Sequence, residues 1–221
     1  YGRYLAFVCI LLSPLLLTKD LGRPARFHHM LRVLKFRSVM SLGSWAISLF
    51  GLCCGMVTAR QMADDHLLDW FPRLARILQA LPIKVIEVVG AVLGLFVGSY
   101  TGVLLAATAV PLWARARYVL GPLFLTSGLS TALSALSLLL SLRPSSQDQE
   151  ALERLEQAEI FTLAAELGLN ATLPPLLRSL KKPLLTGKEG LRYTGGSIGA
   201  GLLVPLLLKL GWRLRGKSTP R

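Results

Sequence analysis

Apolar residues gather in six long runs along the chain, separated by polar or charged segments. A bilayer core of about 30 Å is crossed by about 20 helical residues, so apolar runs of roughly this length are typical of membrane-spanning helices. The pattern predicts an all-α fold, a polytopic transmembrane bundle of about six helices in a single domain over 1–212, with a basic tail over 213–221. The predicted helices cover residues 4–18, 40–59, 85–113, 118–142, 155–169 and 193–212.

One polar connection has its own pattern. Between the second and third runs, apolar residues recur at helical spacing, at Trp70, Phe71, Leu74, Ile77 and Leu78. A short amphipathic helix of this kind is typical of a segment that lies on a membrane surface.

Composition supports a membrane protein. Hydrophobic residues make up 52% of the chain, the mean hydropathy is +0.53, and charged residues make up 17%, whereas about 25% is usual for soluble domains. A net charge of +13 suits either nucleic-acid binding or basic loops that flank membrane helices. The second is favoured, because Lys and Arg stand at the ends of apolar runs. The expected partner is the lipid bilayer, with no nucleic acid.

The chain starts without Met, and its first apolar run begins almost at once. This run resembles a signal-peptide core, but it ends in Thr18, Lys19 and Asp20 with no small-residue cleavage pattern. We therefore expect a helix, in a fragment of a larger bundle that lacks its N-terminal part.

Small residues form stripes on two predicted helices. Glycine occupies every fourth position over 90–102, which leaves a bare ridge where another backbone approaches closely. Glu87 lies eleven residues before Gly98, so it shares that face and should point into the protein. Serines follow one face of the next run, which favours hydrogen bonds to a neighbouring helix over one wall of a water or proton path. They are Ser127, Ser130, Ser134, Ser137 and Ser141.

No enzyme triad or glycine-rich phosphate loop is visible. The histidines, His28, His29 and His66, lie in loops or near their ends. A transmembrane haem normally needs histidines within facing helices, so we expect no haem, and the cysteines have no metal-site spacing. A redox role would then need an organic carrier that dissolves in the membrane.

Ionisable residues in or near membrane helices are the default functional candidates. Asp20, Glu87, Glu159 and Glu166 are the proton-handling candidates. Asp20 is equally well explained as a loop acid paired with a nearby base. Glu159 and Glu166 are seven apart and share a face, which also suits an amphipathic helix at the surface.

Tyr100 and Thr101 sit in the middle of the third run. A Tyr hydroxyl surrounded by apolar groups needs an acceptor. Another helix is the commoner acceptor, and a quinone carbonyl is the functional alternative.

Several strings resemble the NrfD/PsrC family, the membrane subunits of polysulfide-reductase-type complexes. DLGRP at 20–24, with Arg26 nearby, is similar to the loop after that family's second helix. The other strings follow in the family's order and together cover about residues 1–142. They are SVMSLGSW at 38–45, YTGVLL at 100–105, ATAVPLW at 107–113 and LGPLF at 120–124.

This resemblance implies a role. Family members are haem-free and exchange electrons between membrane quinone, either menaquinone or ubiquinone, and a ferredoxin-like iron–sulfur subunit that serves a molybdopterin or cytochrome catalytic subunit. The resemblance thus implies a multi-pass subunit of the inner (cytoplasmic) membrane that is not catalytic alone. It makes Tyr100 and Thr101 the quinone-binding candidates, and gives Arg23 and Arg26 a structural role in the loop.

Two other functions stay open from the sequence. The chain would be a non-redox anchor if its strings only pack helices. It would be a small-solute or ion transporter if it had internal repeats or broken mid-membrane helices, but no convincing repeat is present. The transporter hypothesis is therefore the weakest.

Overall fold

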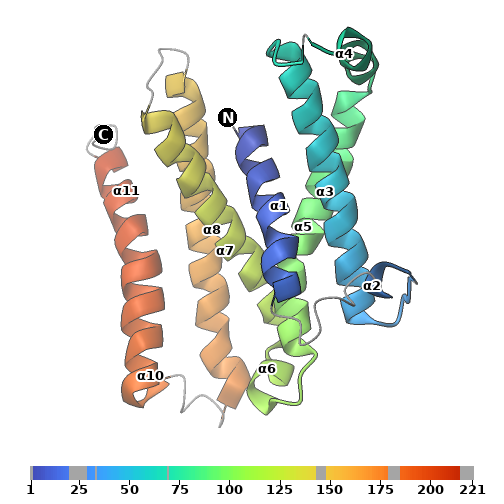
Figure 1. Cartoon of the computed structure of the whole chain (residues 1–221). Coiled ribbons are helices and arrows are strands. Elements are labelled where there is room, and N and C mark those ends of the chain that lie inside the picture. The colour runs from blue at the N-terminus through green and yellow to red at the C-terminus, as the bar shows by residue number, and fades with distance from the viewer. Residues whose placement is uncertain are drawn as a thin grey trace. The chain divides into compact units, whose positions relative to one another are not determined.

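The computed structural model describes residues 2–19, 29–32, 34–68, 70–142, 148–178 and 185–214, and it is helical with no strand over these ranges (Figure 1). Six stretches are long and apolar enough to cross a membrane. They are Gly2–Lys19 (α1), Val39–Asp64 (α3), Ile83–Ala106 (α5), Arg117–Leu142 (α7), Gln149–Leu177 within α8 (Asp148–Leu177), and Gly187–Gly211. The predicted all-α, polytopic membrane fold is confirmed.

The helix predicted over 85–113 is divided in the structure. α5 ends at Ala106, and a second helix, α6 (Pro111–Arg115), begins after a short break. Pro111 occupies the first turn of α6, and Val110 before it is extended (φ −73°, ψ 116°). Proline disfavours helical backbone at the residue that precedes it, so an apolar run that contains Pro111 does not form one helix.

The helix predicted over 155–169 is longer in the structure, because α8 runs from Asp148 to Leu177. Its polar first turns fall outside the apolar run but suit a helix in water. Arg154 and Glu150, one turn apart, form an ion pair of 2.7 Å there. The predicted range therefore missed these polar first turns and, at the other end, residues 170–177, where the helix includes Pro174 and Pro175.

The last predicted helix, 193–212, belongs to a longer helical stretch of three segments. A short helix, α10 (Gly187–Leu191), leads into a π-helical segment, η3 (Arg192–Leu203), and then into α11 (Val204–Leu214). A π-helix has a wider turn than an α-helix, with hydrogen bonds that span five residues. The Val204 N–H makes such a bond to the Gly199 carbonyl. Pro205 follows directly and has no N–H to continue a regular ladder. α11 extends to Leu214, and the rest of the predicted tail lies outside the described residues.

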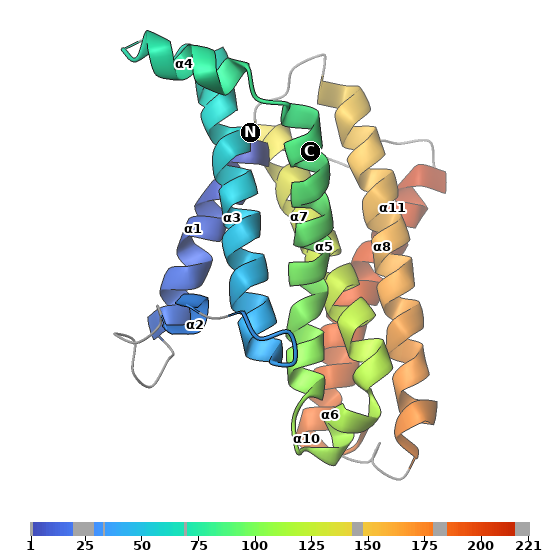
Figure 2. The ribbon, with the colours of Figure 1, turned by 90° about the vertical axis from the view of Figure 1, so that its right-hand side faces the viewer.

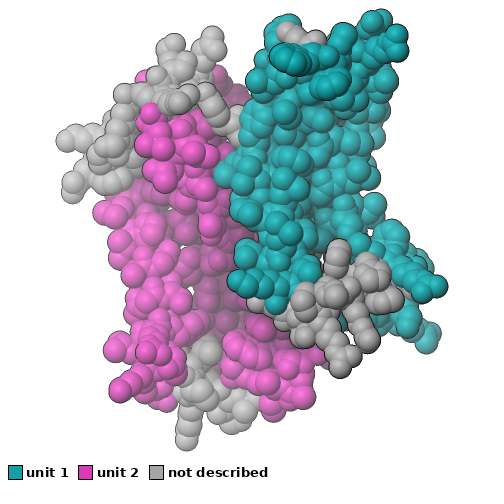
Figure 3. All heavy atoms as spheres, viewed as in Figure 1, with its two compact units in different colours: residues 1–97 teal, residues 98–221 magenta. Residues whose placement is uncertain are grey.

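The chain forms two compact units, Tyr1–Val97 and Gly98–Arg221, with the boundary inside α5 (Figure 3). The single domain over 1–212 stays a prediction.

In the first unit, α1 packs along α3, while α2 (His29–Arg32) and α4 (Pro72–Gln79) pack on α3 as well. Glycines permit close contact here. A Cβ added at Gly94 of α5 would lie 3.1 Å from the Phe50 ring of α3, and one at Gly90 would lie 3.3 Å from Cys53. The glycine ridge of α5 therefore faces α3 in this unit.

In the second unit, α7 packs along α8, and η3 and α11 pack on the same helix. Two clusters of buried apolar side chains fill the spaces between them. Gly102 of α5 meets α7 so closely that an added Cβ would lie 2.5 Å from the Leu120 carbonyl carbon and 2.7 Å from the Gly121 nitrogen. Only glycine fits this approach of two backbones. The cluster residues are Ala116, Leu120, Leu173 and Leu177 in one group and Leu163, Leu202 and Leu206 in the other.

Candidate functional site

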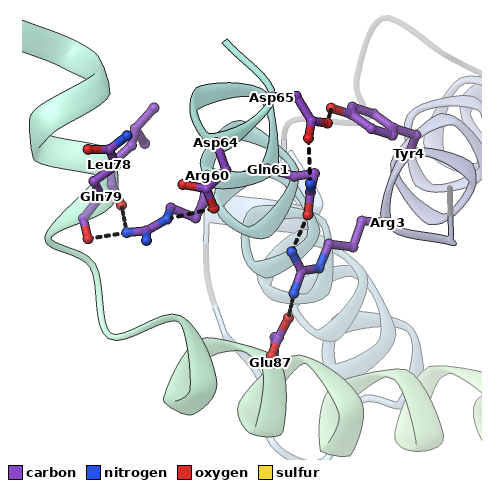
Figure 4. Close-up of polar contacts among 9 residues, drawn as sticks. All are labelled: Arg3, Tyr4, Arg60, Gln61, Asp64, Asp65, Leu78, Gln79 and Glu87. Atoms are coloured by element: carbon purple, nitrogen blue, oxygen red, sulfur yellow. Dashed lines mark hydrogen bonds and ion pairs between the residues drawn. The ribbon is translucent and has the colours of Figure 1, made fainter. Parts of the chain in front are cut away.

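The first unit holds a polar cluster, here called the Arg3 cluster, where the start of α1, the end of α3 and the start of α5 meet (Figure 4). Arg3 Nη2 donates to Glu87 Oε1 at 2.6 Å, and Arg3 Nη1 donates to Gln61 Oε1. Gln61 Nε2 donates to Asp65 Oδ1 at 2.9 Å, and Tyr4 OH donates to the other Asp65 oxygen at 2.6 Å. The chain of contacts joins three helices through charge-assisted hydrogen bonds.

Asp65 lies just beyond the end of α3, outside the membrane-spanning segment. The hydrogen bond from Tyr4, with a second from Gln61, lowers the pKa of the Asp65 carboxyl from its usual value. Both bonds are made to the ionised form, which is why they favour it. Asp65 is therefore negatively charged at neutral pH.

The second unit holds a different set of polar groups, here called the Glu159 column, which lies between α7, α8 and the C-terminal helix. Glu159 and Glu166 are both buried, with exposed fractions of 3% and 7%. Their seven-residue spacing places both on the face of α8 that meets α7, so the alternative of a surface helix does not hold. The column consists of Ser130 and Ser134 (α7), Glu159, Glu166 and Asn170 (α8), Tyr193 (η3) and Lys209 (α11).

The two glutamates have unequal partners. Glu159 accepts from Ser134 Oγ at 2.6 Å and from Lys209 Nζ at 2.7 Å. Glu166 accepts from Ser130 Oγ at 3.2 Å, and within the described part of the chain no lysine or arginine lies at ion-pair distance from it. Burying an ionised carboxylate is costly unless a cation or several donors accompany it. Glu159 has both a cation and a hydroxyl donor, whereas Glu166 accepts from one hydroxyl.

The column continues in both directions along the helices. Asn170 Nδ2 donates to the Glu166 carbonyl at 3.0 Å, and Tyr193 OH donates to Asn170 Oδ1 at 2.8 Å. One turn beyond Ser134, the buried Ser137 hydroxyl has no hydrogen-bond partner among the residues described. Polar groups thus follow the α7–α8 seam over several turns in the interior of helices that qualify as membrane spans.

Tyr100 and Thr101 lie elsewhere on α5. Tyr100 is half-buried and Thr101 is exposed. At about 100° per residue, Tyr100 lies nearly opposite the ridge of Gly98 and Gly102 that contacts α7. A molecule that meets the Tyr100 hydroxyl therefore approaches α5 from the side away from α7.

The remaining predicted site residues, Asp20, Arg23 and Arg26, fall outside the described residues. Glu87 belongs to the Arg3 cluster of the first unit, whereas Tyr100 belongs to the second unit. Over the described ranges, no group of three or more His, Cys, Asp or Glu side chains is arranged to hold a metal ion.

Comparison with known proteins identifies the chain. A family model described as polysulphide reductase, NrfD, matches residues 1–219. The chain belongs to the NrfD family. Protein NrfD of Escherichia coli (strain K12) is 29% identical over 228 residues, which cover 96% of this chain and 71% of that protein. No solved structure matches the chain.

The resemblance stated from sequence strings over about 1–142 is therefore confirmed, and the NrfD match extends through the C-terminal third, including α8, η3 and α11. Membership makes this chain a multi-pass membrane subunit of the polysulphide-reductase type. The Glu159 column lies within the matched region.

Sequence reasoning missed several members of these clusters, among them Arg3, Gln61 and Lys209. Lys209 stands within the last apolar run, so the rule that selected Glu159 and Glu166 as ionisable groups in membrane segments also applied to it. Arg3 lies just before the first predicted helix, outside the apolar runs in which ionisable residues were sought. Gln61 is uncharged, and no pattern in the sequence singles it out.

Proposed function

We infer that this chain is the haem-free, quinone-reactive membrane subunit of a respiratory oxidoreductase in the inner membrane. It would exchange electrons between membrane quinone or quinol, as menaquinone or ubiquinone, and a ferredoxin-like iron–sulfur subunit that serves a molybdopterin or cytochrome catalytic subunit. The observation that carries this proposal is the NrfD family match over residues 1–219. Electron exchange is thus a property of the assembly, to which this chain contributes the membrane side.

Tyr100 is the proposed hydrogen-bond donor to a quinone carbonyl, with Thr101 beside it. Its half-buried position on a membrane-spanning helix suits contact with a carrier that arrives from the lipid. A Tyr presents an apolar ring to the carrier's ring and a hydroxyl to its oxygen.

Quinone reduction takes up two electrons and two protons, and quinol oxidation releases them. Proton exchange needs acids and bases that are reachable by water or by the quinone oxygen. Glu159 and Glu166 form the best-connected acidic pair among the described residues, since serine hydroxyls join each of them to α7. We assign them to proton handling, with Glu87 and Asp20 as further candidates.

The deciding experiment is Tyr100→Phe in the assembled complex. Loss of one hydrogen bond to the carrier should lower quinol turnover and weaken inhibitor binding, by roughly tenfold if the bond contributes about 1.4 kcal/mol. Tyr118→Phe is the matched control, because Tyr118 is exposed on α7 and contacts Arg117. Unchanged turnover and inhibitor binding in Tyr100→Phe would remove Tyr100 from the site.

A non-redox anchor is distinguished by a separate measurement. Direct titration of the purified complex with quinone reports binding without requiring electron flow. If the chain is only an anchor, it binds no quinone. Removing the chain would then release the peripheral subunits from the membrane but would not change the quinone affinity of the remaining complex. Quinone binding that is lost in Tyr100→Phe and kept in Tyr118→Phe would support the redox subunit.

A further inference from the structure

The helix α4, Pro72–Gln79, differs from its neighbours in the first unit. It is eight residues long and joins the end of α3 to the start of α5, two helices that qualify as membrane spans. Figure 2 shows it lying across the end of α3, whereas α3 and α5 run side by side. A short helix that crosses the end of spanning helices lies near the level where the bilayer meets water.

The two faces of α4 differ in chemistry. Ala75 and Leu78 are half-buried, and at 100° per residue Leu74 lies on their face. Leu74 is nevertheless exposed, as is Phe71 just before the helix. This apolar face therefore continues past the part that the protein itself covers.

Arg73 and Arg76 lie on the opposite face of α4, and both are exposed. The helix contains no acidic residue that would neutralise them. Trp70, just before the helix, is 91% exposed, and Trp is enriched where headgroups meet acyl chains. Apolar residues on one side, two cations on the other and an adjacent Trp suit a helix in contact with phospholipid.

The position of α4 is fixed by a contact to α3. Arg60 Nη1 donates to the Leu78 carbonyl at 3.2 Å and to the Gln79 carbonyl, while Arg60 Nε donates to Asp64 at 3.1 Å (Figure 4). A cation at the C-terminal carbonyls of a helix satisfies groups that have no partner within the helix. Arg60 thus ties the C-terminal end of α4 to the last turns of α3.

We propose that α4 is an interfacial helix that binds anionic phospholipid headgroups through Arg73 and Arg76 while Phe71 and Leu74 enter the acyl boundary. Lipid is the occupant because the surface that follows is also apolar and exposed. Val85 and Val88, in the first turns of the membrane-spanning α5, are both exposed. Anionic lipid is favoured over neutral lipid because α4 carries positive charge only.

The test uses the full chain in its purified assembly, placed in nanodiscs of phosphatidylcholine with phosphatidylglycerol. In separate samples, one lipid or the other carries bromine on its acyl chain, which quenches the fluorescence of a nearby Trp. The fluorescence of Trp70 is obtained by subtracting the spectrum of Trp70→Phe. Quenching should favour brominated phosphatidylglycerol. In R73Q/R76Q that preference should fall by roughly fivefold for each arginine removed.

The matched control is R154Q/R192Q, which removes the same number of charges from exposed arginines paired with Glu150 and Glu189 in the other unit. Its lipid preference should equal that of the parent. An unchanged preference in R73Q/R76Q, or no quenching by either lipid, would overturn the proposal. Quenching that appears only after peripheral subunits are stripped would also overturn it, because α4 would then be a protein-docking helix.

Discussion

The two units each contain an ion pair of nearly the same length in different surroundings. Arg3 and Glu87 approach to 2.6 Å, with side chains 39% and 38% exposed, whereas Lys209 and Glu159 approach to 2.7 Å, with side chains 19% and 4% exposed. Distance therefore does not separate the two pairs. Their burial does, and burial decides what each pair contributes.

An exposed pair is screened, and measured contributions are about 0–1 kcal/mol. A buried pair adds little net stability, yet loss of one partner leaves an uncompensated charge at a cost of about 3–5 kcal/mol. The Arg3 cluster is thus a tolerant junction at helix ends. The Glu159 column depends on every partner, which is the property expected where charge is held in place for function.

Lys209→Met should have the largest effect on this comparison. Glu159 would keep Ser134 but lose its cation, so the free energy of unfolding should fall by roughly 3 kcal/mol. Unfolding in mixed detergent and dodecyl sulfate measures this change. The double variant with Glu159→Gln should recover most of the loss, since it removes the stranded charge. A loss in Lys209→Met no larger than that in Arg3→Gln would erase the distinction between the units.

Glycine contacts offer a second, smaller test. An alanine at Gly102 would meet the backbone of α7, which cannot move aside, whereas an alanine at Gly94 would meet the Phe50 ring, which can. Overpacking typically costs about 1–3 kcal/mol, so Gly102→Ala should lie within that range and Gly94→Ala should lie below it. Gly128→Ala is the control, because a Cβ there meets nothing within 4 Å. Equal unfolding curves for all three would show that α5 and α7 are not held in this close contact.

These contrasts also show what the sequence specifies. Apolar runs predicted all six membrane segments, because lipid allows few solutions for a long apolar helix. The break before Pro111 was missed because the effect of proline is local and is not read from hydropathy. The extension of α8 was missed in part because its first turns are polar. The π-helical segment over Arg192–Leu203 has no simple pattern at all.

The polar residues of the candidate site were also predictable in part. The seven-residue spacing of Glu159 and Glu166 predicted their shared face, and the serine stripe of α7 predicted hydrogen bonds to a neighbouring helix. Which helix supplied the neighbour was not predictable, because periodicity describes one helix at a time. Lys209 and Arg3 became partners only through contacts between segments distant in the chain.

Arg3→Gln should have a small effect. Its ion pair with Glu87 is more than one-third exposed, so the change in unfolding free energy should stay within about 1 kcal/mol and shrink as salt is added. Dodecyl sulfate unfolding at low and high salt checks both statements. Glu87→Gln serves as the reciprocal variant and should match Arg3→Gln. A loss well above that size, insensitive to salt, would place the Arg3 cluster in the same class as the Glu159 column.

The smallest expected effect concerns pH and the exposed Tyr4–Asp65 contact. The folded-state pKa of Asp65 is lowered from 3.8, chiefly by the Tyr4 hydroxyl. A lowered folded pKa contributes stability that is present above the unfolded pKa and is lost as pH falls through the folded pKa. Wild type should therefore be slightly more stable than Asp65→Asn at neutral pH. The difference should begin to shrink as pH falls below about 4 and should vanish below the folded-state pKa. Tyr4→Phe should remove most of the same difference, because it removes the donor that lowers the pKa. Thermal unfolding of the three proteins across this pH range measures the effect. A stability difference between wild type and Asp65→Asn that persists at low pH would mean that Asp65 stabilises the protein through its shape and not through its charge.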